Sequence, residues 1–582
     1  TIAELWVLPL MLVIALIENI NIISKKVENS QSQLRIIKEW EGLEKEHLFI
    51  SIKKHIETKK SIHPILAEFL VKILKKNSIH NKEFEAYLLE KLEKREENIE
   101  DIIQQSYHQQ AARKVSIGNS ITSIHTIENL NWNNIVEKLS VVERILRMDP
   151  AGIYSRMDFE SRDYYRREII AIAKECGVAE SYVAKKAIDC AKNFADKNVI
   201  LKRKHVGFYL IDSGKKQLYN SLGKKNRVVI VEKLSSYTLP IFISIAFLAT
   251  LLGIYGYFKY MENNPSVANG VSLSGFIILL SLIPLSDISI GLYNWLHIKN
   301  TKPRFVPKLT FPNGIGEENA TLIVMPTLLS DPEDVEGTIN QLEVHYLSNR
   351  DENFYFAIAG DFIDGDREHL SQDQEILDRA KIAIEHLNKK YEKNPFLYFH
   401  RHRIKSETQN RWMGWERKRG ALIELNNLLR GEKNTSYSYI VGDLSKLSKI
   451  KYVITLDRDT ILPIEEGKKL VGAIAHPLHQ PIINTEKNVV VEGYGLIQPR
   501  ISLDIKSVNK TYLSRIFAGQ GGIDPYTTAI SDVYQDLFGE GIFTGKGIYH
   551  IDTFRKCLGD SLPTNSILSH DLLEGSYLRT GL

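Results

Sequence analysis

Two long uncharged segments constrain the fold of this chain more than any other feature. The first covers 234–258, and the second covers 263–286 and continues past Asp287 to about residue 295. A helix needs about 20 apolar residues to cross the hydrocarbon core of a bilayer. We therefore predict a transmembrane hairpin over 234–297, with helices at about 234–258 and 271–295, and a lipid bilayer as a partner.

Basic side chains flank the predicted hairpin on both sides, whereas its connecting loop has only Lys259. The flanking cations are Lys215, Lys216, Lys224, Lys225, Arg227 and Lys233 before it, and Lys299, Lys302, Arg304 and Lys308 after it. Positive charge favours the cytoplasmic side of a membrane. The sequence thus predicts that both flanks are cytoplasmic, and two buried core helices are the alternative interpretation of the hairpin.

The region before the hairpin, 1–233, is predicted to be mostly helical and cytoplasmic. Apolar residues recur at three- and four-residue spacing through 25–113, and 141–195 has the same pattern. Arginines, aspartate and tyrosines cluster at 161–167. This cluster could bind an anionic ligand, but an ion-paired helix surface is the commoner role of such charges.

An apolar run near the start of the chain, 5–17, is bounded by Glu4 and Glu18 and contains Pro9. It is shorter than the roughly 20 residues that a membrane-spanning helix needs. We interpret it as a buried or membrane-surface helix.

Charge and cysteine content narrow the classes of function. Lys and Arg number 75 against 71 Asp and Glu, a formal net charge of +4, so the chain lacks the basic field of a nucleic-acid-binding protein. We expect no nucleic-acid partner. The three cysteines, Cys176, Cys190 and Cys557, have no spacing typical of a zinc site or a disulfide framework.

After the hairpin, residues 298–582 alternate short apolar strands with helices, which predicts an α/β domain with a largely parallel sheet. The expected strands are 321–325, 354–359, 396–400 and 452–456. The expected helices are 331–349, a long helix after the second strand, and 417–430. We expect this domain to continue beyond Leu582.

Carboxylates follow two of these strands, where ligands bind in open parallel sheets. Asp361 follows the second strand, and Asp457 and Asp459 follow the fourth. Two carboxylates at i and i+2 can hold Mg²⁺ or Mn²⁺ together with a diphosphate, so a nucleotide-sugar site fits. Surface turns also contain such aspartates. A phosphatase with an aspartyl nucleophile on a D-x-D-x-T motif is a further interpretation, but Ile461 stands in place of the threonine and weakens it.

Cations and glycines supply further candidates. Lys418 and Arg419 lie beside a glycine at a predicted helix start, which suits a diphosphate, although a basic solvated turn is equally typical. The segments 492–500, 519–524 and 538–547 are rich in glycine, which allows close approach to a sugar but also simply makes turns.

Ser569-His570-Asp571 precedes a predicted helix, so Asp571 is a candidate general base and also a candidate helix N-cap. Its sequence position alone favours the cap.

With these motifs the chain resembles the cyclic β-1,2-glucan synthases, whose glycosyltransferase domain is akin to the processive inverting transferases of the cellulose-synthase type. The resemblance covers most of the chain. Its most specific stretches are 411–422 and 531–541; shorter ones include 4–6, 17–19, 149–154, 205–209 and 342–346.

The resemblance implies a GT-A-like fold for 298–582, in a multi-pass protein of the bacterial inner membrane with its catalytic domain in the cytoplasm. It implies transfer of glucose from UDP-glucose, with inversion, onto a growing β-1,2-glucan chain. The implied roles are a uridine-side carboxylate for Asp361, diphosphate contacts for Lys418 and Arg419, diphosphate and metal ligands for Asp457 and Asp459, a base for Asp571, and acceptor-side positions for Gly545 and Lys546.

The chain also departs from the wider superfamily. Ser569-His570-Asp571 stands where relatives have T-E-D. Their later Q-x-x-R-W motif is missing from this chain. The similar segment 409–412 is one residue shorter than that motif and precedes the aspartate pair, so it is not a substitute. We expect that C-terminal regions of the full-length protein, including a phosphorylase-like region, complete the transferase. We also expect that this chain binds the donor but turns over poorly. The alternatives are an inactive membrane-anchored sugar-binding or scaffold protein and, third, a phosphatase.

Overall fold

The computed structural model describes residues 1–59, 61–76, 82–94, 98–193, 201–224, 251–260, 303–502, 508–517, 533–559, 561–564 and 570–582, with a few single residues between them. The described chain divides into two compact units, Thr1–Val141 and Val142–Leu582. Most of the predicted hairpin at 234–297 lies outside the described residues. Within it, residues 251–260 are helical, and the hairpin as a whole stays a prediction.

The first unit is helical, as the spacing of its apolar residues predicts. Its helices are α1 (Ile2–Glu41), α2 (Lys45–Thr58), α3 (Pro64–Lys76), α4 (Lys82–Glu93), α5 (Ile99–Asn129) and α6 (Trp132–Leu139). Trp40 of α1, Ile52 of α2, Leu70 of α3 and Phe84 of α4 are buried together. Burial of this apolar face accounts for the short helices α2 to α4, which would be marginal alone.

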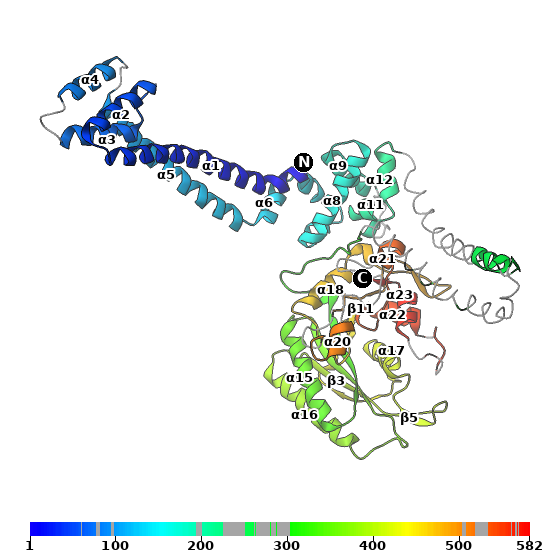
Figure 1. Cartoon of the computed structure of the whole chain (residues 1–582). Helices are drawn as coiled ribbons and strands as arrows, with labels where there is room; N and C mark the ends of the chain where they lie inside the picture. Colours follow the sequence, from blue (N-terminus) through cyan, green and yellow to red (C-terminus); the bar gives the residue numbers. More distant parts are fainter. Residues whose placement is uncertain are drawn as a thin grey trace. The chain divides into compact units, whose positions relative to one another are not determined.

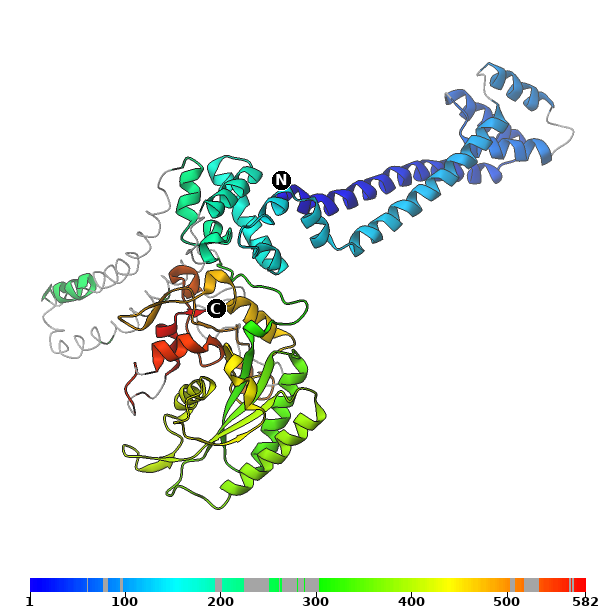
Figure 2. The same cartoon turned by 180° about the vertical axis from the view of Figure 1, so that it is seen from behind.

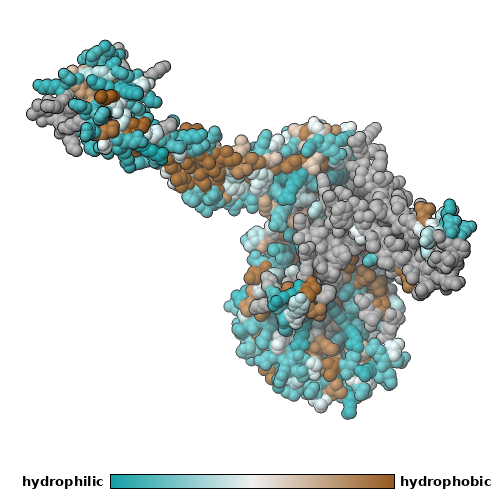
Figure 3. All heavy atoms as spheres, viewed as in Figure 1, coloured by the Kyte–Doolittle hydropathy of each residue, from teal (hydrophilic) through white to brown (hydrophobic). Residues whose placement is uncertain are grey.

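The apolar run 5–17 lies within α1 and is not buried, so the buried alternative for this run is wrong. Leu10 and Met11 are each 59% exposed, and Pro9 lies inside the helix rather than ending it. Of the helices in the described part of the chain, α1 is the one long and apolar enough to cross a membrane, with only 6% of its most apolar window buried. Figure 3 shows apolar side chains gathered along this part of the unit. Length and composition alone do not establish a span, because signal sequences share them.

The second unit begins with short helices: α7 (Val141–Leu146), α8 (Phe159–Cys176), α9 (Glu180–Lys192), α10 (Leu201–Lys204), α11 (Gly207–Ile211) and α12 (Lys215–Ser221). The charged cluster at 161–167 is ion-paired, as predicted, but part of it is buried rather than on the helix surface. Arg166 is fully buried, with its guanidinium 2.7 Å from Glu143 and 3.4 Å from Asp163. A guanidinium already compensated in this way is not free for an anionic ligand.

These helices and the sheet domain share backbone hydrogen bonds. Met157 forms a β-bridge with Leu309, and the amide of Thr310 donates to the carbonyl of Arg156 at 2.8 Å. The amide of Lys308 donates to Ser161 Oγ at 2.8 Å. Segments that precede and follow the undescribed residues 225–250 therefore belong to one compact unit.

The core of the second unit is a mixed, mostly parallel sheet of eight strands in the order β12-β10-β11-β7-β1-β2-β3-β6. Its strands are β1 (Thr321–Leu329), β2 (Phe354–Phe362), β3 (Phe396–Arg401), β6 (Tyr437–Val441), β7 (Tyr452–Thr455), β10 (Leu496–Ile497), β11 (Gly547–His550) and β12 (Thr580–Gly581). Strands β7, β1, β2 and β3 are parallel neighbours, whereas β6 and β11 run antiparallel to theirs. This confirms the predicted α/β domain with a largely parallel sheet.

Helices cover both faces of this sheet (Figure 1; Figure 2). One face packs against α15 (Pro332–Ser348), α16 (Asp373–Lys390) and α18 (Glu466–Ile474), and the other against α17 (Arg417–Leu429), α22 (Ile551–Leu558) and α23 (Asp571–Leu578). Alternate residues of each strand face opposite layers, so Ile323 and Phe356 contact the first and Leu322 and Ala357 the second. Two short hairpins, β4 (Ile404–Ser406) with β5 (Arg411–Met413) and β8 (Ile482–Asn484) with β9 (Val489–Glu492), lie outside the sheet.

Strand β1 is longer than predicted, because it continues through Pro326 to Leu329. Proline cannot donate to a sheet ladder and is normally confined to edges. Here β7 pairs with β1 only as far as Val324, so beyond that residue β1 has a neighbour only on its β2 side among the described strands. The proline therefore lies where one edge of this central strand has no paired neighbour among the described strands.

Candidate active site

The candidate site lies at the carboxyl ends of β2 and β7, on either side of β1. The chain passes from β1 to β2 and β3 on one side and later returns to β7 on the other, which makes this edge a topological switch point. Ligands of open α/β sheets bind at such points. Asp361 is the penultimate residue of β2, and Asp457 follows β7 by two residues, so both lie at this edge as predicted.

Asp361 is held by an arginine that sequence reasoning missed. Arg401, the last residue of β3, is fully buried and donates from Nε and Nη2 to the two carboxylate oxygens at 2.7 and 2.6 Å. Its guanidinium also donates to the carbonyls of Trp415 and Arg417 and to Glu424. Burial alone would lower the pKa of Arg401, but its hydrogen bonds and charge pairing with Asp361 raise it well above its ordinary value.

Asp457 lies between two lysines. Lys418 Nζ is 2.5 Å from Oδ1 of Asp457, and Lys546 Nζ is 2.6 Å from Oδ2. Burial would raise the pKa of this carboxyl, but the two ammonium groups outweigh burial and hold it below its ordinary value. Two cations on one carboxylate leave a local net positive charge, which suits a doubly charged phosphate ligand.

Gly545 connects this cluster to Asp571. Its carbonyl accepts a hydrogen bond from Lys418 at 2.8 Å, and its φ of 81° lies in the left-handed region that favours glycine. A Cβ at this position would lie 2.9 Å from both carboxylate oxygens of Asp571 and 3.0 Å from Lys418 Nζ. A side chain here would push the carboxylate and the ammonium group aside, and the positive φ favours glycine whatever the space.

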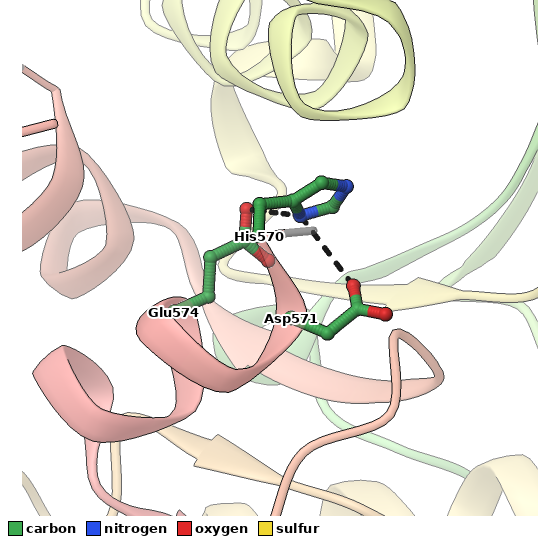
Figure 4. A group of neighbouring side chains, drawn as sticks. All are labelled: His570, Asp571 and Glu574. Atoms are coloured by element: carbon green, nitrogen blue, oxygen red, sulfur yellow. Dashed lines mark ion pairs between the residues drawn. The ribbon is translucent and has the colours of Figure 1, made fainter. Parts of the chain in front are cut away.

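Asp571 is the first residue of α23, and His570 occupies the N-cap position, so the N-cap role considered for Asp571 is wrong. Figure 4 shows Asp571 and Glu574 on either side of the His570 ring. His570 Nδ1 is 3.0 Å from Glu574 Oε1 and 3.4 Å from Asp571 Oδ1. Burial would lower the pKa of His570, but the two carboxylates, Glu574 first, raise it.

Two predicted site residues are not brought into this cluster. Asp459 is exposed in the turn after β7, and within the described part of the chain its carboxylate has no ion pair. Arg419 is buried with its Nη2 2.7 Å from Glu416 and 3.5 Å from the carbonyl of Pro563, so it links parts of the domain. Lys418 and Arg419 are consecutive in α17 and point about 100° apart, so they cannot both face one ligand.

The carboxylates are compatible with a divalent cation. Asp457 and Asp459 have the hard carboxylate oxygens that Mg²⁺ and Mn²⁺ prefer as ligands. Both oxygens of Asp457 already contact lysines, so an ion bound there would replace at least one ammonium group. His570, Asp571 and Glu574 form a second group, with one potential ligand atom from each lying within 4.8 Å of the others.

The fold and this edge define an α/β domain that gathers lysines and carboxylates at a switch point, an arrangement suited to a phosphorylated ligand. No protein-family model matches the chain. Among curated proteins, it is 33% identical over an alignment of 603 residues to cyclic beta-(1,2)-glucan synthase NdvB of Rhizobium meliloti (strain 1021), which covers 100% of the chain and 21% of that protein. The chain is therefore related to the cyclic β-1,2-glucan synthases, as the resemblance predicted, and it spans about a fifth of the length of this relative.

Proposed function

We propose that this chain contains the donor-binding and catalytic part of a membrane glucosyltransferase that builds β-1,2-glucan from UDP-glucose with inversion. The relationship to a cyclic glucan synthase supports glycosyl transfer as the reaction class. The observation that carries the proposal is the close approach of both Lys418 and Asp571 to Gly545, which joins a phosphate-compatible cluster to a candidate base. The proposal includes a GT-A-like fold for this domain, and the mostly parallel sheet is compatible with it.

In this proposal the lysines bind the diphosphate of the donor. Lys418 and Lys546 exchange their contacts with Asp457 for contacts with the phosphate oxygens. Asp457 and Asp459 would hold a divalent cation, which would supply electrophilic stabilisation of the departing UDP. Asp361, oriented by Arg401, lies on the uridine side of the same edge.

Asp571 acts as the base. Its carboxylate accepts the proton of the acceptor hydroxyl, at the end of the growing β-glucan chain, as that oxygen attacks the anomeric carbon. A base on the side opposite the leaving group gives inversion in a single displacement. Gly545 lies near both Lys418 and Asp571, which supports acceptor-side positions for Gly545 and Lys546.

We also propose the cellular setting that the resemblance implies. The protein is a multi-pass protein of the bacterial inner membrane whose catalytic domain faces the cytoplasm, where UDP-glucose is made. The lipid bilayer and the C-terminal regions of the full-length protein are its partners.

Binding of UDP-glucose to the detergent-solubilised chain, with and without Mg²⁺ or Mn²⁺, tests the donor site. We expect metal-dependent binding of UDP-glucose that is selective over UDP-galactose and GDP-mannose. Asp459→Ala should weaken this binding by at least about tenfold, because a metal ligand is lost. Ser445→Ala is the control for surface substitution, because Ser445 is exposed and precedes β7, whereas the aspartate pair follows that strand. A folded chain that binds no nucleotide sugar would instead favour the inactive scaffold, and hydrolysis of a phosphate ester would favour the phosphatase.

A further inference from the structure

The turn that leads into α17 has an uncommon backbone conformation. Glu416 and Arg417 both have a φ of 51°, in the left-handed region that residues with a side chain seldom adopt. Two such residues in succession cost free energy, and they persist only where the surrounding structure holds them. The next residue is Lys418, which contacts Asp457 and the carbonyl of Gly545. The direction of this lysine therefore depends on the turn.

Arg401 holds this turn from the end of β3. Its side chain is fully buried, and its guanidinium donates to the carbonyl of Trp415 at 2.8 Å and to the carbonyl of Arg417 at 2.9 Å. The first carbonyl belongs to the peptide before Glu416, and the second belongs to the peptide that joins Arg417 to Lys418. A guanidinium has N–H donors in fixed directions, so it can bind two carbonyls and a carboxylate at once, which the compact ammonium group of a lysine cannot reproduce.

The same guanidinium binds the carboxylate that is proposed for the uridine side. Arg401 donates from Nε and Nη2 to the two oxygens of Asp361 at 2.7 and 2.6 Å. Its Nη2 donates both to Asp361 and to the carbonyl of Arg417. One nitrogen atom and one peptide bond therefore connect Asp361 to Lys418.

Two glycines allow this close packing. A Cβ at Gly414 would lie 2.7 Å from Oδ2 of Asp361 and 2.9 Å from Nη2 of Arg401. A Cβ at Gly420 would overlap the carbonyl oxygen of Trp415. The turn is thus packed against Arg401 on one side and against the first turn of α17 on the other.

The two left-handed residues are held in different ways. Glu416 pairs with Arg419 at 2.7 Å, and both side chains are buried. The side chain of Arg417 is 55% exposed and pairs with Asp364, and exposed ion pairs contribute little. The conformation of Arg417 therefore depends chiefly on the hydrogen bond that its carbonyl accepts from Arg401.

We propose that Arg401 is a positioning residue for donor binding, which holds the left-handed turn so that Lys418 faces the diphosphate while Asp361 faces the uridine. The inference rests on the proposed function, in which these two residues bind those two parts of the donor. The guanidinium is occupied by acceptors of the protein itself, so it acts on the donor only through them. The two halves of a nucleoside diphosphate are then recognised from one common support.

The test compares the binding of UDP and of uridine by the detergent-solubilised full-length protein. Uridine lacks the diphosphate, so it reports on the uridine side alone. Arg401→Lys keeps a positive charge beside Asp361 but lacks the fork that binds two carbonyls. We expect it to weaken UDP binding by at least about tenfold, because a charge-assisted contact with phosphate is lost, and to leave uridine binding unchanged. In a Lys418→Met background the same change should weaken UDP binding by less than about twofold, because the lysine that Arg401 directs is already absent.

Relief of the backbone strain at Arg417 gives a second readout, which a merely structural role of Arg401 would not move. Glycine adopts a positive φ at no steric cost, so Arg417→Gly should recover at least about threefold of the UDP affinity lost in Arg401→Lys. Arg417→Ala is the matched control, because it removes the same exposed side chain but keeps a Cβ. Asn410→Gly controls for a general gain in stability, because Asn410 is exposed, between β4 and β5, with a φ of 50°. Neither control should recover UDP affinity.

Arg417→Val, in the otherwise unchanged protein, provides the same test if Arg401→Lys does not fold. A β-branched residue disfavours a positive φ more strongly than alanine does, and the replaced side chain is exposed. We expect Arg417→Val to bind UDP at least about threefold more weakly than Arg417→Ala and to bind uridine equally well.

The proposal is refuted if Arg401→Lys binds UDP like the wild type, or if it loses uridine binding as strongly as UDP binding. It is also refuted if the losses in Arg401→Lys and Lys418→Met are additive, if Arg417→Gly recovers no more than its two controls, or if Arg417→Val binds UDP as well as Arg417→Ala.

Lys418→Met separates this inference from the proposed function. Unchanged UDP binding in Lys418→Met would refute the role of this lysine at the diphosphate, and with it the proposed donor site. Weaker UDP binding in Lys418→Met, together with unchanged binding in Arg401→Lys, would refute only the role of Arg401.

Discussion

Arg401 has more polar partners than any other side chain described at the carboxyl edge of the sheet. It is fully buried and pairs with Asp361 through two hydrogen bonds. Removing one partner of a buried ion pair leaves an uncompensated charge and typically costs about 3–5 kcal/mol. We expect Arg401→Met, which retains much of the volume, to lower the free energy of unfolding of the second unit by about this amount, as measured by denaturant unfolding followed by tryptophan fluorescence.

A second arginine of the same unit provides the comparison. Arg430 contacts Asp552 at 2.6 Å, but the aspartate is 58% exposed, so water already solvates the pair. Exposed ion pairs contribute about 0–1 kcal/mol, and we expect Arg430→Met to cost no more than this. Equal losses in the two variants would contradict the importance assigned to burial of the Asp361 pair.

At the scale of elements, α17 and the loop before β11 each direct one lysine at Asp457. In the proposed site, a metal ion at Asp457 would have to displace at least one of these lysines, so the free protein should bind metal weakly until a diphosphate accepts the lysines. We expect Lys546→Met to increase the affinity for Mn²⁺ without nucleotide severalfold, because one competing cation is removed. Electron paramagnetic resonance of free Mn²⁺ measures this directly.

Lys449→Met is the control for this experiment, since Lys449 is a lysine of the same unit that pairs with exposed Glu317. Its Mn²⁺ affinity should equal that of the wild type. If Lys546→Met binds Mn²⁺ no better than Lys449→Met, the lysines do not compete with the metal.

The elements that the sequence predicted well are those with strong local signals. Helix α15 begins after Asp331, whose side chain accepts hydrogen bonds from the amides of Glu333 and Asp334, and α17 is followed by Gly431 with a φ of 86°. Strands β10 and β12 have two residues each, too few to show any alternation of apolar residues. Their pairing depends on segments distant in sequence, which local patterns do not report.

The same reasoning explains which site residues could be predicted. Asp361 and Asp457 could be found because parallel strands bring their carboxyl ends together. Arg401 was missed because its partner lies on another strand, although a basic residue at the end of a buried strand was an available signal. The direction of Arg419 depends on the turn at Glu416 and Arg417, both at φ 51°, which no spacing rule predicts.

At the scale of the whole molecule, the second unit restricts the topology of the undescribed hairpin. Residues 156–158 lie before it and residues 308–310 lie after it, yet the two segments are joined by backbone hydrogen bonds. A compact unit cannot be divided by a bilayer. If the chain between these residues crosses a membrane, we therefore expect an even number of crossings, as in the predicted pair of helices.

We therefore expect cysteines at Lys216→Cys and Asn313→Cys, both exposed positions, to react with a membrane-impermeant maleimide from the same side of the membrane, the cytoplasmic one. Asn263→Cys, in the predicted loop, should react only from the opposite side, because two crossings separate it from either flank. Each cysteine is introduced into a variant that lacks Cys176, Cys190 and Cys557. Labelling of the two flanks from opposite sides would show that the second unit is not one body in the membrane. Labelling of Asn263→Cys from the cytoplasmic side would refute the hairpin while leaving the sheet domain and its site intact.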